Sequence, residues 1–205
     1  MIPTLIRLHG SLMVIAWMFL CTNGIILSRH YKHVWKKRGL KGLDAWLIAH
    51  QVFHSMTLIC SAVATFVIVY FVQGYSYLNP SPFGAHPICG FTSIGLVLLN
   101  PVIALCRCPL TSSRRAIFNV VHKFLGLLAV ALAIPTITLG LIMLRNMTVT
   151  TSPYSILTVF QAFVILYIIT ELALESIDYW VLVQERSATA LVINLYFQNN
   201  DAASM

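Results

Sequence analysis

The stretch Arg114–Gly140 reads RRAIFNVVHKFLGLLAVALAIPTITLG, which is long enough and apolar enough to span a membrane. It nevertheless carries His122 and Lys123 about two turns in from its basic end. An ionisable residue inside a lipid span is costly, so by default it marks a functional site. Three further apolar stretches each carry a histidine at a comparable depth, and these are His9, His50 and His86.

The composition places the chain among integral membrane proteins. Of its 205 residues, 59% are hydrophobic and 9% are charged, and the mean hydropathy is +0.84, whereas a water-soluble domain carries about a quarter charged residues. The five cysteines are odd in number and scattered, so they predict no disulfide framework. The net charge of +7 lies in short loops between apolar stretches. This placement excludes a nucleic-acid-binding surface and makes the lipid bilayer the expected partner.

The fold class that we expect is an all-α integral membrane protein with five transmembrane helices. Crossing the hydrocarbon layer takes about 20 residues, and the segments that reach this length are 5–28, 44–72, 83–106, 116–144 and 153–183. Their short connections predict that the first four pack as an up-and-down bundle. We expect residues 1–183 to form one transmembrane domain and 184–205 a cytoplasmic tail. The first helix lacks the features of a cleavable signal peptide, so we expect it to be retained as an anchor.

The basic residues predict the orientation in the membrane. Nine of them lie in the two loops that follow the first and third helices: Arg29, Lys32, Lys36, Lys37, Arg38, Lys41, Arg107, Arg114 and Arg115. The loops that follow the second and fourth helices contain only Arg145. By the positive-inside rule the first set is cytoplasmic. The amino terminus is then outside and the carboxyl terminus inside.

The four histidines sort by depth into two pairs. With alternating helix directions, His9 and His86 lie near the outer surface and form the outer pair, while His50 and His122 form the inner pair. In the predicted bundle each pair lies across a diagonal of about 11–14 Å between helix axes. That distance is too wide for two imidazoles to share a bare metal ion, and it suits imidazole–iron–imidazole ligation through a haem.

Two glycines support this interpretation. Gly90 follows His86 by four residues, and Gly126 follows His122 by four. Residues four apart lie on one helix face, where a missing side chain leaves room for a flat macrocycle against the backbone. The alternative is that both glycines serve close helix packing, which is common in membrane helices.

A fifth histidine leaves the inner site ambiguous. His54 lies one turn deeper than His50 on the same helix face. We choose His50 as the ligand because its depth matches that of His122, which leaves His54 to hydrogen-bond a propionate or to pack. His30 and His33 lie in the basic loop and are expected to be solvated.

At these residues the sequence resembles the transmembrane domain of the cytochrome b561 superfamily, closest to its ferric-chelate-reductase 1 and stromal-cell-derived-receptor 2 branch. The matching stretches are LHGSLMVIAW around His9, WLIAH ending at His50, HPICG beginning at His86 and FNVVHKFLG around His122. One departure is Asn100-Pro101, which stands where the family has Gln-Pro. The resemblance implies two haem b groups, each held by two histidines. It also implies electron transfer across a membrane from cytoplasmic ascorbate or a similar reductant.

The resemblance further implies the partners. The acceptor on the outer side would be ferric iron, a ferric chelate or monodehydroascorbate. Members of this branch carry extracellular domains, including a DOMON domain, before the first helix, and four residues precede it here, so a partner protein is one alternative for that role. The basic residues nearest the inner pair are the candidates for binding anionic ascorbate: Lys123, Arg114 and Arg115. The plasma membrane and an endomembrane vesicle both remain open, as does a homodimer.

Two other functions compete with a transmembrane ferric reductase. One is a metal-ion or proton transporter that uses the histidines as a relay, which the absence of intramembrane carboxylates beside them weakens. The other is a non-catalytic membrane accessory protein that keeps the fold.

Overall fold

All regular structure in the described part of the chain is helical. The computed structural model describes residues 3–32, 34–35, 43–74, 82–109, 111–146 and 154–203. Five helical segments in it are long and apolar enough to cross a membrane, as predicted. The chain divides into two compact units, Met1–Val164 and Ile165–Met205.

The helix bounds lie close to those predicted for the first four spans. The first span consists of α1 (Thr4–Val14), a π-helical segment η1 (Ile15–Cys21) and α2 (Thr22–His30). The next three are α3 (Ala45–Val72), α4 (Ala85–Leu105) and α5 (Arg115–Asn146). The π-helical segment has no counterpart in the sequence prediction. The last helix is α6 (Tyr154–Ala203).

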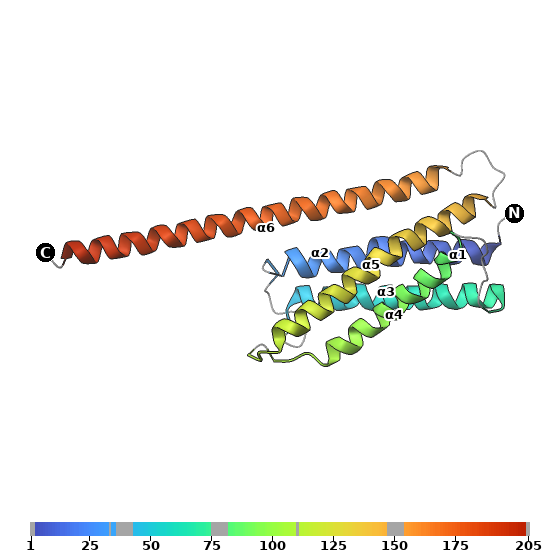
Figure 1. Ribbon diagram of the computed structural model, residues 1–205, viewed down its shortest axis with the longest axis horizontal. Helices are drawn as coiled ribbons and strands as arrows, with labels where there is room; N and C mark the ends of the chain where they lie inside the picture. Colours follow the sequence, from blue (N-terminus) through green and yellow to red (C-terminus); the bar gives the residue numbers. More distant parts are fainter. Residues whose placement is uncertain are drawn as a thin grey trace. The chain divides into compact units, whose positions relative to one another are not determined.

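The four spans of the first unit run beside one another as antiparallel helices (Figure 1), and their contacts form a ring. The first span packs along α3, and α4 packs along α5, while smaller contacts of α1 with α5 and of α3 with α4 close the ring. In such a ring α1 lies diagonally opposite α4, and α3 diagonally opposite α5. These are the diagonals predicted for the outer and inner pairs.

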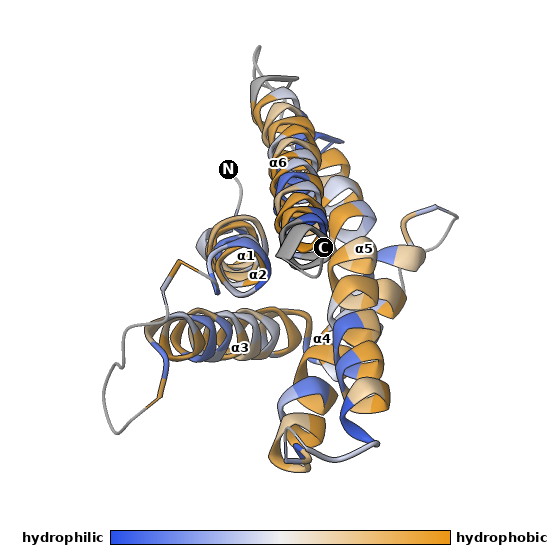
Figure 2. Cartoon of the chain, turned by 90° about the vertical axis from the view of Figure 1, so that its left-hand side faces the viewer, coloured by the Kyte–Doolittle hydropathy of each residue, from blue (hydrophilic) through white to orange (hydrophobic). Residues whose placement is uncertain are grey.

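The interior of this bundle is small and its outward faces are apolar. The buried cluster comes from η1, the middle of α5 and the start of α6: Ala16, Trp17, Met18, Cys21, Ala129, Val130, Ala133, Ile137 and Phe160. Apolar residues also dominate the outer faces of the spans (Figure 2), where Phe66 is 71% exposed and Leu105 is 88% exposed. Apolar surface on this scale would be unfavourable in water, so these faces are lipid-facing.

Small hydroxyl side chains connect the helices inside the bundle. Ser93 is buried on α4 and donates to the carbonyl of Ala129 on α5 at 2.7 Å. Thr57 is buried on α3 and donates to the carbonyl of Ala16 at 3.3 Å. In a membrane, where lipid tails are as apolar as leucine, close contacts and hydrogen bonds of this kind hold helices together.

The last helix continues well past its predicted end. We expected it to stop at Val183, whereas α6 runs to Ala203. The segment 184–203 contains no proline or glycine that would end it. In the second unit its serine and threonine hydroxyls donate back to carbonyls four residues earlier, as Thr170 does to Leu166 and Ser176 to Leu172.

Candidate functional site

The outer pair meets across one diagonal of the bundle. His9 belongs to the second turn of α1, and His86 is the second residue of α4. Their ring centroids are 6.3 Å apart, with the ring planes at 75°. Both rings line a mostly apolar cavity of about 280 Å³, together with Gly90, Thr136 and other residues of α1, α3, α4 and α5. The first pairing predicted from depth is therefore present as a side-chain contact.

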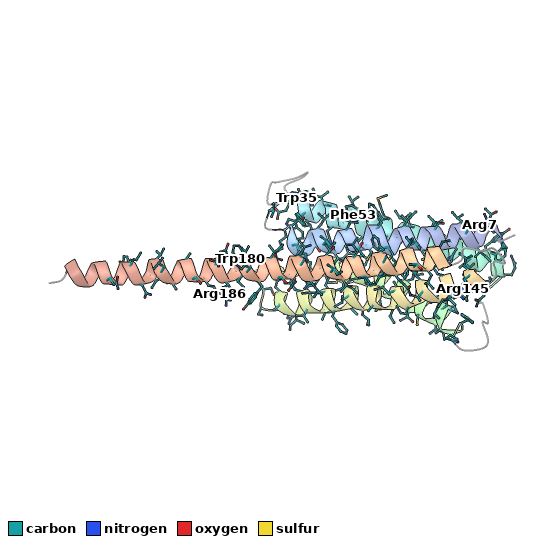
Figure 3. All side chains as sticks on the ribbon, turned by 90° about the horizontal axis from the view of Figure 1, so that it is seen from above. Arg7, Trp35, Phe53, Arg145, Trp180 and Arg186 are labelled. Carbon is teal, nitrogen blue, oxygen red and sulfur yellow. The ribbon has the colours of Figure 1, made fainter. Side chains whose placement is uncertain are left out.

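The inner pair repeats this arrangement on the other diagonal. The ring centroids of His50 on α3 and His122 on α5 are also 6.3 Å apart, with the planes at 62°. His50 and Ala64, whose carbonyl contacts His9, are fourteen residues apart on α3, so the two pairs are separated by roughly 20 Å along the axis. Figure 3 shows the two ends of the bundle, with Arg7 and Arg145 at the outer end and Trp35 toward the inner end.

Backbone carbonyls of the adjacent helix orient three of the four rings. Nδ1 of His9 donates to Ala64 at 2.9 Å, Nδ1 of His50 to Gly24 at 3.0 Å and Nδ1 of His86 to Thr136 at 2.8 Å. His122 lies beside the Asn100 backbone, but its buried Nδ1 makes no hydrogen bond of acceptable geometry. A proton held on Nδ1 leaves Nε2 as the nitrogen with a free lone pair, which is how metal-ligating histidines are usually prepared.

The ring separation fits two imidazoles that share one metal ion. With metal–nitrogen bonds of about 2.0 Å and ring nitrogens about 1.1 Å from the ring centre, such centroids stand about 6.2 Å apart when the metal lies in line between the rings. This is closer than the helix-axis diagonal suggests, because the side chains reach inward. The separation alone therefore does not distinguish haem iron from a bare ion. In the described residues no three His, Cys, Asp or Glu side chains converge as a metal site.

His54 lies beside the inner pair. Its ring centroid is 4.4 Å from that of His50, and its Nε2 is buried without a hydrogen-bond partner. The ring centroids of His50 and His122 are 6.3 Å apart, the same separation as in the outer pair. This geometry favours His50 as the ligand.

The two glycines chosen from the sequence have different surroundings. Gly90 lines the outer cavity, where a Cβ would stand 3.5 Å from the methyl group of Thr136, an ordinary contact. At Gly126 a Cβ would stand 3.1 Å from Nδ2 of Asn100, so this glycine makes room for the asparagine side chain. Asn100 is the residue that departs from the family pattern, and its own Oδ1 is buried without a partner.

The predicted donor-binding residues differ in exposure. Lys123 and Arg114 are exposed, whereas Arg115 is half-buried and donates from Nη1 to the carbonyl of Cys108 at 2.7 Å. The Arg115 guanidinium lies 5.3 Å from the ring centre of Phe118. Phe118 is stacked on His122 at 5.7 Å, with the planes within 10°. Phe118 therefore connects the Arg115 side chain at the end of the bundle to His122 of the inner pair.

Arg107 is a further candidate, which the sequence pattern did not distinguish from the other basic loop residues. It is close enough to interact electrostatically with His50 and His122. Desolvation, and then the neighbouring charge of Arg115, lower its pKa, and the side chain stays cationic at neutral pH. The turn after α4 therefore brings two arginines together beside the inner pair, a favourable setting for an anion.

The expectation for His30 was wrong. His30 is the last residue of α2 and is only 7% exposed, because the helix continues two residues beyond its predicted end and keeps the side chain against the bundle. His33 lies outside the described residues.

Comparison with known proteins identifies a matching family and several relatives. The model of the family described as eukaryotic cytochrome b561 matches residues 8–147, which contain all four paired histidines. The putative ferric-chelate reductase 1 of Xenopus laevis is 36% identical over 139 residues, 68% of this chain and 23% of that protein. Ferric-chelate reductase 1 of Homo sapiens is 33% identical over 137 residues, 67% of this chain and 22% of that protein.

A plant protein extends the similarity. A cytochrome b561, DM13 and DOMON domain-containing protein of Arabidopsis thaliana is 32% identical over 140 residues, 65% of this chain and 14% of that protein. The chain thus spans less than a quarter of the length of these three relatives. No solved structure matches the chain.

Proposed function

The chain belongs to the eukaryotic cytochrome b561 family, and from this premise we propose that it carries electrons across a membrane through two bis-histidine haem b groups. The observation that carries the proposal is the repetition of one geometry. Two histidine pairs, each with ring centroids 6.3 Å apart, lie near opposite ends of one membrane-spanning bundle. A relay of protons or bare ions does not need this repetition, whereas two haems in series do.

Each haem would be held by one diagonal pair, His9 with His86 and His50 with His122. When bound, the haems supply a one-electron Fe(III)/Fe(II) couple at each end of the bundle. The chain's own part is to present Nε2 of each ring. The rings of His9, His50 and His86 are held by the carbonyls of Ala64, Gly24 and Thr136, in that order. The apolar residues between the two ends keep water out of the bundle. His54, Gly90 and Gly126 complete the surroundings of these sites.

The donor and acceptor complete the proposed reaction. Ascorbate, or a similar reductant, would lose one electron and one proton on the cytoplasmic side and leave as monodehydroascorbate. The electron would reduce ferric iron or a ferric chelate, Fe(III) to Fe(II), on the outer side. Support for this acceptor comes from the names of the relatives, which are ferric-chelate reductases.

The arginines at the inner end are expected to set the rate at which an anionic donor reduces the protein. Arg107→Gln and Arg115→Gln should each slow reduction by ascorbate about tenfold at low ionic strength, with smaller effects for Arg114→Gln and the exposed Lys123→Gln. Added salt should reduce the difference, because screening weakens capture of a charged ligand. Stopped-flow absorbance of the haem bands measures the rate.

Two controls separate capture of the donor from damage to the site. Arg7→Gln changes a cation at the opposite end of the bundle (Figure 3) and should leave the rate unchanged. An uncharged hydroquinone should reduce the arginine variants as fast as the unmodified chain. Equal slowing with both reductants would show that the arginines act on the haem and not on the donor.

The orientation is tested with epitope tags. The nine basic residues in the loops after the first and third helices favour a cytoplasmic position for those loops, which puts the amino terminus outside. An amino-terminal tag should therefore be accessible to antibody on intact cells. A carboxyl-terminal tag should be reached only after permeabilisation. The reverse pattern would exchange the donor and acceptor sides.

The proposal as a whole is tested by the visible spectrum of purified protein, oxidised and then reduced, with the haem-to-protein ratio. Two low-spin, six-coordinate b haems per chain are expected. A chain purified without haem would favour the histidine relay or the accessory protein.

A further inference from the structure

A glycine lies against the inner pair where α2 packs on α3. Gly24 is buried, and its carbonyl accepts the hydrogen bond from Nδ1 of His50 at 3.0 Å. A Cβ on Gly24 would stand 2.7 Å from Nε2 and 3.0 Å from Cδ2 of His54. Because real Cβ atoms essentially never come closer than 3.0 Å to another heavy atom, the missing side chain leaves the space that the His54 ring uses.

The same contact reaches the predicted ligand. The His54 ring meets the His50 ring edge to face, with centroids 4.4 Å apart and planes at 63°. The Cβ of Phe53 would also stand 3.2 Å from a Cβ on Gly24, and this atom is fixed to the α3 backbone. A side chain at Gly24 would therefore press His54 toward His50 or move α2 away from α3. The second movement lengthens the hydrogen bond that orients His50.

We propose that Gly24 and His54 together position His50. The Gly24 carbonyl holds Nδ1 of His50, and the His54 ring, seated where Gly24 has no side chain, supports the His50 ring from the deeper turn of α3. In this arrangement His54 is a positioning residue and not a haem ligand. The inference rests on the proposed function, in which His50 and His122 hold the inner haem.

The chain contains matched control positions. A Cβ on Gly10 in α1 or on Gly95 in α4 would meet nothing within 4 Å. Gly10 adjoins His9 and lines the outer cavity, whereas Gly95 does not line it, so Gly95 is the control. An alanine at either position adds the same methyl group to a helix without the predicted clash, and it has the better helix propensity.

The experiment compares full-length Gly24→Ala, His54→Ala, the double variant and Gly95→Ala. Haem content and the low-spin ferric EPR signals are measured, since these signals report the orientation of the axial imidazoles. Gly24→Ala should bind the inner haem about tenfold more weakly, as overpacking predicts, and should shift its signal while the outer signal stays unchanged. The double variant should regain the inner haem, because removing the His54 ring removes the clash. Gly95→Ala should match the unmodified chain.

His54→Ala should keep both haems, with a shifted inner signal because the support of His50 is gone. Loss of a haem in His54→Ala would make His54 a ligand and overturn the inference. A double variant as impaired as Gly24→Ala would also overturn it, as would a Gly24→Ala variant with an unchanged inner signal.

Melting temperatures of the haem-free protein test the contact between Gly24 and His54 independently of haem binding. There Gly24→Ala should melt below the unmodified chain, and the double variant should recover part of the loss. Failure of this rescue overturns the inference even where haem binds. An unmodified chain that binds no haem overturns the proposed function, and the melts still decide whether Gly24 and His54 are in contact.

Discussion

His122→Ala is expected to yield a purified chain with one haem in place of two. The inner site would keep only His50 at a position where two imidazoles face each other at 6.3 Å, and a haem bound by one ligand inside an apolar bundle loses most of its affinity. The outer pair, roughly 20 Å away along the axis, should hold its haem unchanged. The haem-to-protein ratio and the EPR signals of the remaining low-spin haem measure this outcome.

The other three ligands provide the internal controls. His50→Ala should lose the same haem as His122→Ala, whereas His9→Ala and His86→Ala should lose the other and retain the inner signal. His54→Ala should retain both. If His54→Ala loses a haem while His50→Ala keeps two, the choice of His50 as the ligand is wrong.

Loss of the inner pair should also disconnect the outer haem from a reductant inside sealed vesicles. In His122→Ala vesicles loaded with ascorbate, the outer haem should stay oxidised, as it does in the same vesicles without ascorbate. The physical reason is distance, because the remaining redox centre lies at the far end of an apolar bundle that excludes ascorbate.

Dithionite added outside should reduce this outer haem at once, which shows that the haem is present and reducible. His86→Ala supplies the opposite case, since internal ascorbate should still reduce its inner haem. Reduction of the outer haem by internal ascorbate at the unmodified rate in His122→Ala would contradict transfer through the inner site.

Sequence patterns predicted the spans well because the bilayer fixes the length of apolar sequence that each needs. The end of α6 was missed because membrane thickness does not limit a helix beyond the membrane, and 184–203 contains no residue that ends one. The π-helical segment Ile15–Cys21 was missed because no local composition encodes this geometry.

The two histidine pairs were predictable because the depth of each histidine in the membrane follows from its position in the sequence and the direction of its helix. Their hydrogen-bond partners were not predictable, because the carbonyls of Ala64 and Thr136 are backbone atoms with no residue-type signal. The role of Gly24 was not predictable either, because it lies 26 residues from His50 and contacts it only through the packing of α2 on α3. Arg107 reaches the inner pair only because the turn after α4 brings it there.

Electron flow across a sealed membrane tests the proposed reductase most directly. Vesicles that contain the unmodified, haem-replete chain are loaded with ascorbate, and a membrane-impermeant ferric chelate is supplied outside. We predict that both haems become reduced and that ferrous iron then appears outside, at a rate that depends on the amount of protein and falls with internal ionic strength. Vesicles whose haems are present and reducible, yet which never form external ferrous iron from internal ascorbate, would contradict it.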